Sequence, residues 1–152
     1  MNILIIAVLV ALDQTLKLWA LRFLASAGSI PVISGIFHLT YVENRGAAFG
    51  VLQNKRWFFI ILTVVIVSGV MYFMHKNKGM NTYLRLSLDL VVAGAIGNLI
   101  DRVRLGFVVD FLDFRIWPVF NIADICVVVG GISLAYILLF KSEMLEIREG
   151  KF

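Results

Sequence analysis

Four long apolar runs constrain the fold of this 152-residue chain more than any other feature. A helix that crosses a bilayer needs about 20 mostly apolar residues, and soluble domains are only about 45–50% apolar. Here 61% of the residues are hydrophobic. We therefore expect a mainly α, integral membrane protein, forming a single membrane domain over residues 1–152. The expected transmembrane spans are about residues 2–21, 57–74, 83–100 and 122–140.

The basic residues suggest how these spans are oriented, because lysine and arginine favour the cytoplasmic side of a membrane. The loop after the second span and the C-terminal tail hold Lys76, Lys78, Arg85, Lys141, Arg148 and Lys151. We expect both termini to be cytoplasmic, with outer loops at about 22–56 and 101–121. These outer loops also contain arginines, so the charge bias is only a weak guide. Because the basic residues flank the apolar runs, we expect no nucleic-acid partner.

The first apolar run has an alternative interpretation as a cleaved signal peptide. Ala25-Ser26-Ala27 resembles a cleavage site. However, no basic segment precedes the run, and Asp13 and Lys17 interrupt it where a signal peptide would continue to be apolar. We therefore favour a transmembrane span.

Polar residues gather at one end of three of the expected spans and in the first outer loop. Carboxylates at the edge of the hydrocarbon layer are costly, because an ionised oxygen loses its water there. Their convergence therefore predicts a functional site near the outer interface. Asp89 is the main exception: it lies within the third span with no partner in the sequence, and we expect it to face the bundle interior. The converging residues are Asp13, Lys17, Asn44, Asn98, Asp101, Asn121 and Asp124.

Asp110 and Asp124 are the candidates for catalysis. Two carboxylates that lie close together share one proton, so one can accept a proton from water while the other donates one to the reacting group. Asp124 falls in the first turn of the fourth span, three residues after Asn121, a favourable N-cap. The helix dipole there favours an ionised carboxylate, so we expect Asp124 to be ionised. The alternative, that Asp124 only caps its helix and Asp110 is a loop carboxylate, is left open by the residues alone.

The charged residues around this pair have structural interpretations as well. Asp13 and Lys17 are spaced to form an ion pair along one helix. Asp101 is placed to pair with Arg102 or Arg104, or to orient another side chain. Either set could line the site, or it could be a neutralised group that faces the bundle.

The outer loops are expected to contain strands. Residues 37–42 alternate in polarity, which indicates a half-buried strand. Asn44-Arg45-Gly46 predicts a turn, after which residues 47–52 could return as a second strand. Residues 107–112 form another strand-like segment that could pair with the first.

The main rival function is a small proton-coupled membrane transporter, because embedded Asp and Lys residues also mark ion paths. A transporter needs polar residues through the full depth of the membrane. The inner halves of the second and fourth spans are almost wholly apolar, which argues against it. A structural membrane subunit without any chemistry is a third possibility.

Several sequence blocks, in collinear order, resemble the bacterial lipoprotein signal peptidase (signal peptidase II) family. The resemblance covers nearly the whole chain, and the order and spacing of the blocks make it specific. The blocks are DQTLK at 13–17, NRGAAFG at 44–50, GAIGNLIDRVRLGFVVDF at 94–111 and FNIAD at 120–124.

The resemblance implies a four-helix membrane aspartyl endopeptidase with a small extracytoplasmic β-cradle, located in the bacterial cytoplasmic (inner) membrane. It would cleave the signal peptide from diacylglyceryl-modified prolipoproteins immediately before the lipidated cysteine. No cofactor and no metal are implied. Its partners would be this substrate, membrane lipid and globomycin-type inhibitors, and we expect a monomer.

The resemblance also assigns residues. Asp110 and Asp124 match the family's catalytic pair. The other matching positions support or line the site: Asp13, Lys17, Asn44, Gly46, Asn98, Asp101, Arg102, Asn121 and Ala123. Two features depart from the family pattern. Ile125-Cys126 stands where small or polar residues are common, and Asp89 stands where the family is usually apolar.

Overall fold

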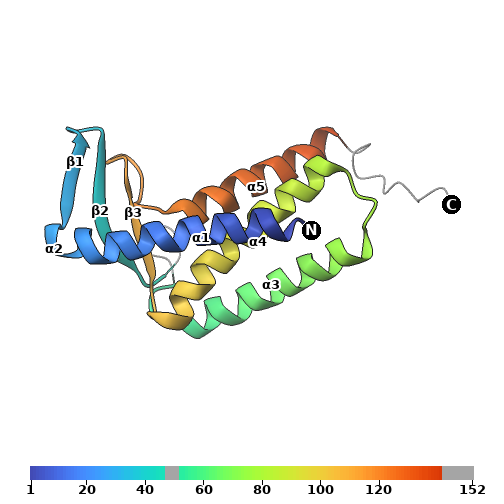
Figure 1. The fold of residues 1–152 in the computed structure, drawn as a ribbon, viewed down its shortest axis with the longest axis horizontal. Coiled ribbons are helices and arrows are strands. Elements are labelled where there is room, and N and C mark those ends of the chain that lie inside the picture. Colours follow the sequence, from blue (N-terminus) through green and yellow to red (C-terminus); the bar gives the residue numbers. More distant parts are fainter. Residues whose placement is uncertain (47–51, 142–152) are drawn as a thin grey trace.

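Long helices carry a small sheet at one end in the computed structural model, which describes residues 1–46 and 52–141 (Figure 1). The helices are α1 (Ile3–Trp19), the π-helical turn η1 (Ala20–Leu24), α2 (Ala25–Ala27), α3 (Arg56–Lys76), α4 (Thr82–Arg104) and α5 (Ile122–Phe140). The strands are β1 (Ser29–Ile33), β2 (Phe37–Asn44) and β3 (Val108–Asp113).

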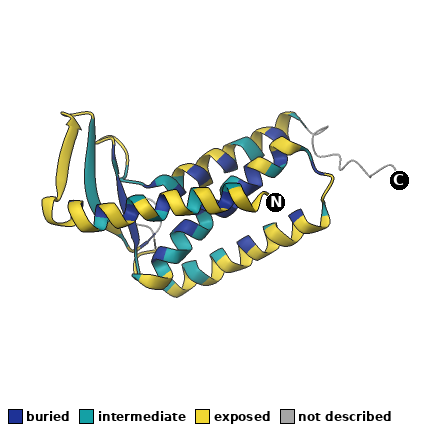
Figure 2. Cartoon of the chain, in the orientation of Figure 1, coloured by how far each residue is buried: buried dark blue, intermediate teal, exposed yellow. Residues whose placement is uncertain are grey.

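Four helical segments are long and apolar enough to cross a membrane: α1 together with η1 and α2, then α3, α4 and α5. Figure 2 shows exposed residues along the length of the bundle, and many of them are large hydrophobic residues. In α3, for example, Val67 and Met74 are the buried residues among its 21 residues. Lipid, rather than water, suits such a surface. The prediction of a mainly helical membrane protein with four transmembrane helices is confirmed.

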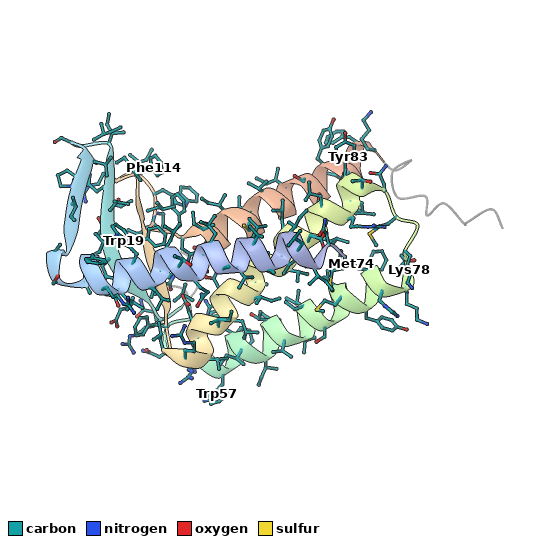
Figure 3. The ribbon with its side chains drawn as sticks, in the orientation of Figure 1. Trp19, Trp57, Met74, Lys78, Tyr83 and Phe114 are labelled. Atoms are coloured by element: carbon teal, nitrogen blue, oxygen red, sulfur yellow. The ribbon has the colours of Figure 1, made fainter. Side chains whose placement is uncertain are left out.

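Tryptophan residues mark the sheet end of this bundle. Figure 3 shows Trp19, Trp57 and Phe114 at that end, whereas Lys78 and Tyr83 lie at the other. Trp19 and Trp57 are 37% and 68% exposed. Indole rings favour the membrane–water interface, so the sheet lies at the level of one membrane surface.

Helix α4 is central to the packing, because it contacts α1, α3 and α5. Gly97 lets the helices come close together near the sheet. A Cβ atom built on it would lie 2.7 Å from the Asp13 carboxylate and 3.1 Å from the Ala123 side chain. This close approach brings the polar residues of α1, α4 and α5 together.

The sheet has the order β1-β2-β3, with both pairs antiparallel. The strands predicted at 37–42 and 107–112 correspond to β2 and β3, and they pair as expected, with Val42 opposite Asp110. Most of the expected returning strand at 47–52 lies outside the described residues. The other neighbour of β2 is β1, which the sequence interpretation missed.

Two of the predicted span ends fall short of the helices. The first helical segment does not end near Leu21 but continues to Ala27. It continues because Leu24 is fully buried against β3, and Gly28, with a φ of 72°, then ends it. Helix α4 extends past residue 100 to Arg104, which keeps Asp101 on a helix facing α1.

Asp89 is 1% exposed, and it has a partner that the sequence did not reveal. Both of its carboxylate oxygens accept from the backbone N–H of Asn2, at 3.2 and 3.1 Å. Asn2 in turn is the N-cap of α1. Asp89 therefore ties the start of α1 to α4, away from the sheet end of the bundle.

Candidate active site

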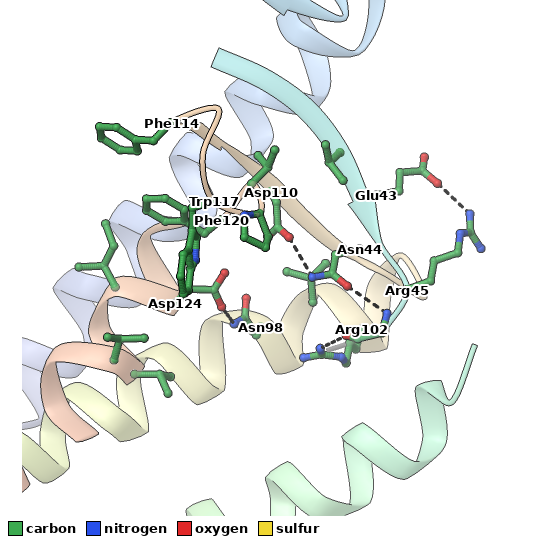
Figure 4. A pocket seen from close by; sticks show the side chains of 18 of the residues that line it. Glu43, Asn44, Arg45, Asn98, Arg102, Asp110, Phe114, Trp117, Phe120 and Asp124 are labelled. Carbon is green, nitrogen blue, oxygen red and sulfur yellow. Dashed lines mark hydrogen bonds and ion pairs between the residues drawn. The ribbon is translucent and has the colours of Figure 1, made fainter. Parts of the chain in front are cut away.

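A cavity of about 870 Å³ opens between the sheet, α4 and α5. Figure 4 shows Asp110 and Asp124 beside each other in its wall, contributed by β3 and α5. Polar groups are gathered on one side, and aromatic and aliphatic side chains form the rest. Among its lining residues are Asn44, Gly46, Asn98, Arg102, Asp110, Phe114, Trp117, Phe120, Asp124 and Val128.

Asp110 lies in a strand that is buried along most of its length, and it is itself only 1% exposed. Its two oxygens accept from two amides. The side-chain Nδ2 of Asn121 donates to Oδ1 at 2.6 Å, and that of Asn44 donates to Oδ2 at 3.0 Å. The carboxylate is therefore fixed from both sides.

Asp124 lies in the first turn of α5, and Asn121 is the N-cap of that helix, as its spacing predicted. The structure adds that the two residues form a capping box. The Asn121 side chain accepts from the Asp124 N–H at 2.8 Å, and the Asn121 N–H donates to the Asp124 carboxylate at 3.3 Å. Asn98 Nδ2 donates to the other carboxylate oxygen at 2.8 Å. Asp124 is less buried than Asp110, so it is the more accessible carboxylate.

Asn121 joins the two carboxylates directly. It is completely buried, and its side chain contacts Asp110 while its backbone N–H contacts Asp124. The spacing indicated its helix-capping role, and the family resemblance placed it among the residues that support the site, but neither predicted its bond to Asp110. Asn121 therefore ties the middle of β3 to the start of α5.

The pKa of Asp110 is raised from its ordinary value of 3.8 to about 7. Burial is the largest cause, and the neighbouring Asp124 carboxylate is the second. Hydrogen bonds from Asn44 and Asn121 offset part of this rise. A carboxyl group in an apolar site near a second carboxylate retains its proton to a higher pH. Asp110 is thus suited to carry a proton near neutral pH.

Lys17 is the centre of a buried charge cluster behind this pair. Its ammonium lies 2.9 Å from Asp13 and 3.0 Å from Asp101, and each of the three side chains is at most 3% exposed. It also donates to Asn98 Oδ1 at 2.9 Å. Because an ammonium can only donate, this bond turns the amide group of Asn98 toward Asp124. The lysine thereby orients a partner of a candidate catalytic carboxylate.

The two carboxylates of this cluster also hold the ends of other elements. Asp13 accepts from the Ala123 N–H at 2.9 Å, at the start of α5. Asp101 accepts from the Val109 N–H at 3.1 Å, next to Asp110. The expected Asp13–Lys17 ion pair is present. Asp101 was expected to pair with Arg102 or Arg104, or to orient another side chain. Within the described part of the chain it has no arginine ion pair; it pairs with Lys17 and accepts from the backbone of β3.

Asn44, Gly46 and Arg102 form a third part of the site. The Gly46 N–H donates to Asn44 Oδ1 at 3.0 Å, which leaves the Asn44 amide group facing Asp110. Arg102 donates to the Gly46 carbonyl at 3.1 Å and lies 4.8 Å from the centre of the Phe59 ring. This turn therefore links β2 to α4 at the edge of the cavity.

Two groups of site residues were missed in the sequence. Gln14 donates to Asp101 at 2.9 Å and to the Gly97 carbonyl at 3.2 Å, but a lone glutamine beside Asp13 gives little signal. The aromatic wall of Phe114, Trp117 and Phe120 was also missed. The sequence does contain a clue to this wall, because aromatic residues are concentrated in the short segment between β3 and α5.

The arrangement provides a carboxyl group, a carboxylate and fixed amides, which is the equipment for activating water by general acid–base catalysis. Cys126 is a free cysteine that is buried within α5. Among residues 1–46 and 52–141, no three side chains of His, Cys, Asp or Glu are placed to hold a metal ion together.

Comparison with known proteins assigns the family. Residues 5–140 match the family model for signal peptidase (SPase) II. The chain belongs to the signal peptidase II family. It is 54% identical to the lipoprotein signal peptidase of Clostridioides difficile, over 93% of this chain and 97% of that protein. It is 55% identical to that of Caldanaerobacter subterraneus, over the same shares of the two chains.

Solved structures agree with this family assignment. A bacterial membrane enzyme determined by the in meso method at 1.9 Å resolution superposes with a TM-score of 0.82 at 38% identity, covering 91% of this chain and 92% of that one. This member of the signal peptidase II family is therefore a multi-pass membrane peptidase. None of these comparisons supports the transporter alternative.

Proposed function

We propose that this protein cleaves the signal peptide from diacylglyceryl-modified prolipoproteins immediately before the lipidated cysteine, with Asp110 and Asp124 as its catalytic pair. The observation that carries the proposal is that Asn121 holds both carboxylates at the wall of one cavity. Membership of the signal peptidase II family supports the substrate class.

In the proposed mechanism Asp124 is the base and Asp110 the acid. A water molecule between them gives a proton to Asp124 as its oxygen attacks the scissile carbonyl carbon, while Asp110 gives its proton to the carbonyl oxygen. The C–N bond of the resulting diol then breaks. Asp124 passes its proton to the departing amine nitrogen, and one hydroxyl of the diol returns a proton to Asp110. The raised pKa of Asp110 supports this assignment of roles.

The cavity walls suit a peptide that is anchored by lipid. Val127, Val128 and Val129 of α5 line the cavity beyond Asp124, within a helix long enough to span the membrane. Asn44 and Arg45 line the opposite, polar side. We expect the diacylglyceryl group to lie along the aliphatic wall and the peptide backbone to contact the polar side.

The proposed location is the bacterial inner membrane, with both termini cytoplasmic and the sheet end facing outward. The basic residues between α3 and α4 support this orientation. A single chain supplies both carboxylates, which supports a monomeric enzyme. Globomycin-type inhibitors are expected to occupy the same cavity, in competition with the substrate.

The rate of cleavage is expected to fall as the pH rises through about 7, because Asp110 must be protonated to act as the acid and its pKa is raised to about 7. Below that pH the proton is present and this limb of the profile is flat. This fall is measured from kcat/KM between about pH 5 and about pH 9, because kcat/KM reports the ionisations of the free enzyme. A rate that rises steadily through this range would contradict Asp110 as the acid.

The substrate class is tested with two forms of one prolipoprotein, with and without the diacylglyceryl group on its cysteine. We expect purified enzyme in lipid nanodiscs to cleave the modified form and to leave the unmodified form largely intact, because the lipid holds the scissile bond at the depth of the site. Equal cleavage of both forms would contradict recognition of the lipid. The identity of the bond follows from the masses of the products.

A further inference from the structure

A second cavity, of about 640 Å³, lies at the end of the bundle opposite the sheet. It is formed by Met1, the last turns of α3, the loop to α4 and the first turn of α4. Figure 3 shows Met74 and Lys78 at this end. Its lining includes Met71, Tyr72, Met74, His75, Lys78 and Arg85. Neither this cavity nor these residues take part in the site described above.

The lysine, arginine and histidine side chains of this cavity make its surroundings basic. Lys78 and Arg85 are both in its lining, together with His75. The ammonium of Lys76 lies 5.8 Å from the centre of the Tyr72 ring, which places a further positive charge beside the wall. No Asp or Glu is among the described lining residues. The nearest acidic residue along α4 is Asp89, whose two oxygens are already occupied by the Asn2 N–H.

Arg85 has one buried N–H donor that no described residue accepts from. Its Nη2 donates to the Lys78 carbonyl at 2.5 Å, which holds the guanidinium against the loop. Its Nε is buried but has no hydrogen-bond partner among residues 1–46 and 52–141. A buried donor without an acceptor is costly. The planar guanidinium group matches the oxygens of a phosphate, which can accept from two donors at once.

The position of the cavity indicates that its ligand is amphipathic. Both α3 and α4 are apolar enough to span a membrane, and the cavity lies where one ends and the other begins, at the membrane–water boundary. On its membrane side the lining is apolar, with Met71, Tyr72 and Met74, and Met74 is only 2% exposed. Basic residues form the other side. Basic pockets between transmembrane helices bind the headgroups of anionic lipids.

We propose that this cavity binds an anionic phospholipid, with the headgroup phosphate at Arg85 and Lys78 and the glycerol backbone against Met71 and Tyr72. The inference is independent of the catalytic proposal, because it requires only that this end of the bundle lies at a membrane surface. It makes the enzyme's stability depend on the charge of the surrounding lipid, since a ligand that binds only the folded state stabilises it.

The experiment titrates purified full-length protein in neutral detergent with short-chain phosphatidylglycerol and follows the thermal unfolding temperature. Wild type is compared with the double variant Arg85→Gln/Lys78→Gln and with Lys55→Gln, which removes an exposed lysine at the other end of the bundle. We expect phosphatidylglycerol to raise the Tm of wild type and of Lys55→Gln equally. In the double variant we expect its apparent affinity to fall by at least about tenfold, from the loss of two basic contacts.

Two further arms identify the ligand. Phosphatidylcholine with the same acyl chains should raise the Tm much less, and glycerol 1-phosphate, which lacks the chains, should bind weakly. Equal effects of the two lipids would overturn recognition of the charge, and equal binding of glycerol phosphate would make this a site for a soluble anion.

Because Arg85 also holds the loop, Lys78→Gln alone is the second test. Its side chain is exposed, and we expect about a fivefold loss of affinity. Unchanged affinity in both variants would overturn the proposal.

Discussion

Asp110→Asn and Asp124→Asn are each expected to lower kcat/KM for a diacylglyceryl-modified prolipoprotein by about 10³-fold or more, because each removes one half of a general acid–base pair. An asparagine at either position retains the size of the side chain but can neither accept the proton of water nor return one to the substrate. Initial rates at several substrate concentrations, with each variant in the same detergent, measure the loss.

The double variant makes this prediction sharper. If the two carboxylates act as a unit, removing both should cost little more than removing one. Asp113→Asn is the matched control, because Asp113 lies in the same strand but bonds Thr40 at 2.8 Å and Arg115 at 3.1 Å instead. Its kcat/KM should be near that of wild type. Losses that multiply in the double variant would mean that the two carboxylates act independently.

Lys17→Met is expected to lower the free energy of unfolding by about 3–5 kcal/mol, because it leaves the buried carboxylates of Asp13 and Asp101 without their shared cation. Both carboxylates lie within 3.0 Å of the Lys17 ammonium. Methionine fills a similar volume, so the loss reports the charge rather than a cavity. Thermal or denaturant unfolding in one detergent measures it.

Glu43→Gln is the control for this measurement. Glu43 pairs with Arg45 at 2.8 Å, but their side chains are 39% and 54% exposed, respectively. An exposed ion pair contributes only about 0–1 kcal/mol. If Lys17→Met were no more destabilising than Glu43→Gln, the buried cluster would not be a structural centre of the site.

The sequence predicted those features that depend on nearby residues. Apolar runs of sufficient length indicated the spans, and the spacing of Asn121 and Asp124 indicated a capped helix start. The spacing of Asp13 and Lys17 indicated their ion pair. In each case the partners lie within one or two helical turns, so the periodicity of the helix alone brings them together.

Contacts between distant segments could not be predicted in the same way. Lys17 meets Asn98 across 81 positions, and Asp89 meets Asn2 across 87. Both contacts depend on how closely α1 and α4 pack, which no local pattern encodes. Likewise, the family resemblance placed Asp110 in the site as a catalytic residue. That Asp110 also accepts a hydrogen bond from Asn121 follows only from the contact between β3 and the start of α5.

The catalytic pair is tested by measuring cleavage of a diacylglyceryl-modified prolipoprotein by wild type, Asp110→Asn and Asp124→Asn, with and without a metal chelator. The masses of both products identify the bond, and thermal unfolding verifies that the variants are folded. We expect wild type to cleave immediately before the lipidated cysteine whether or not the chelator is present, and neither variant to cleave. Near wild-type cleavage by either folded variant would contradict the assignment of the catalytic pair.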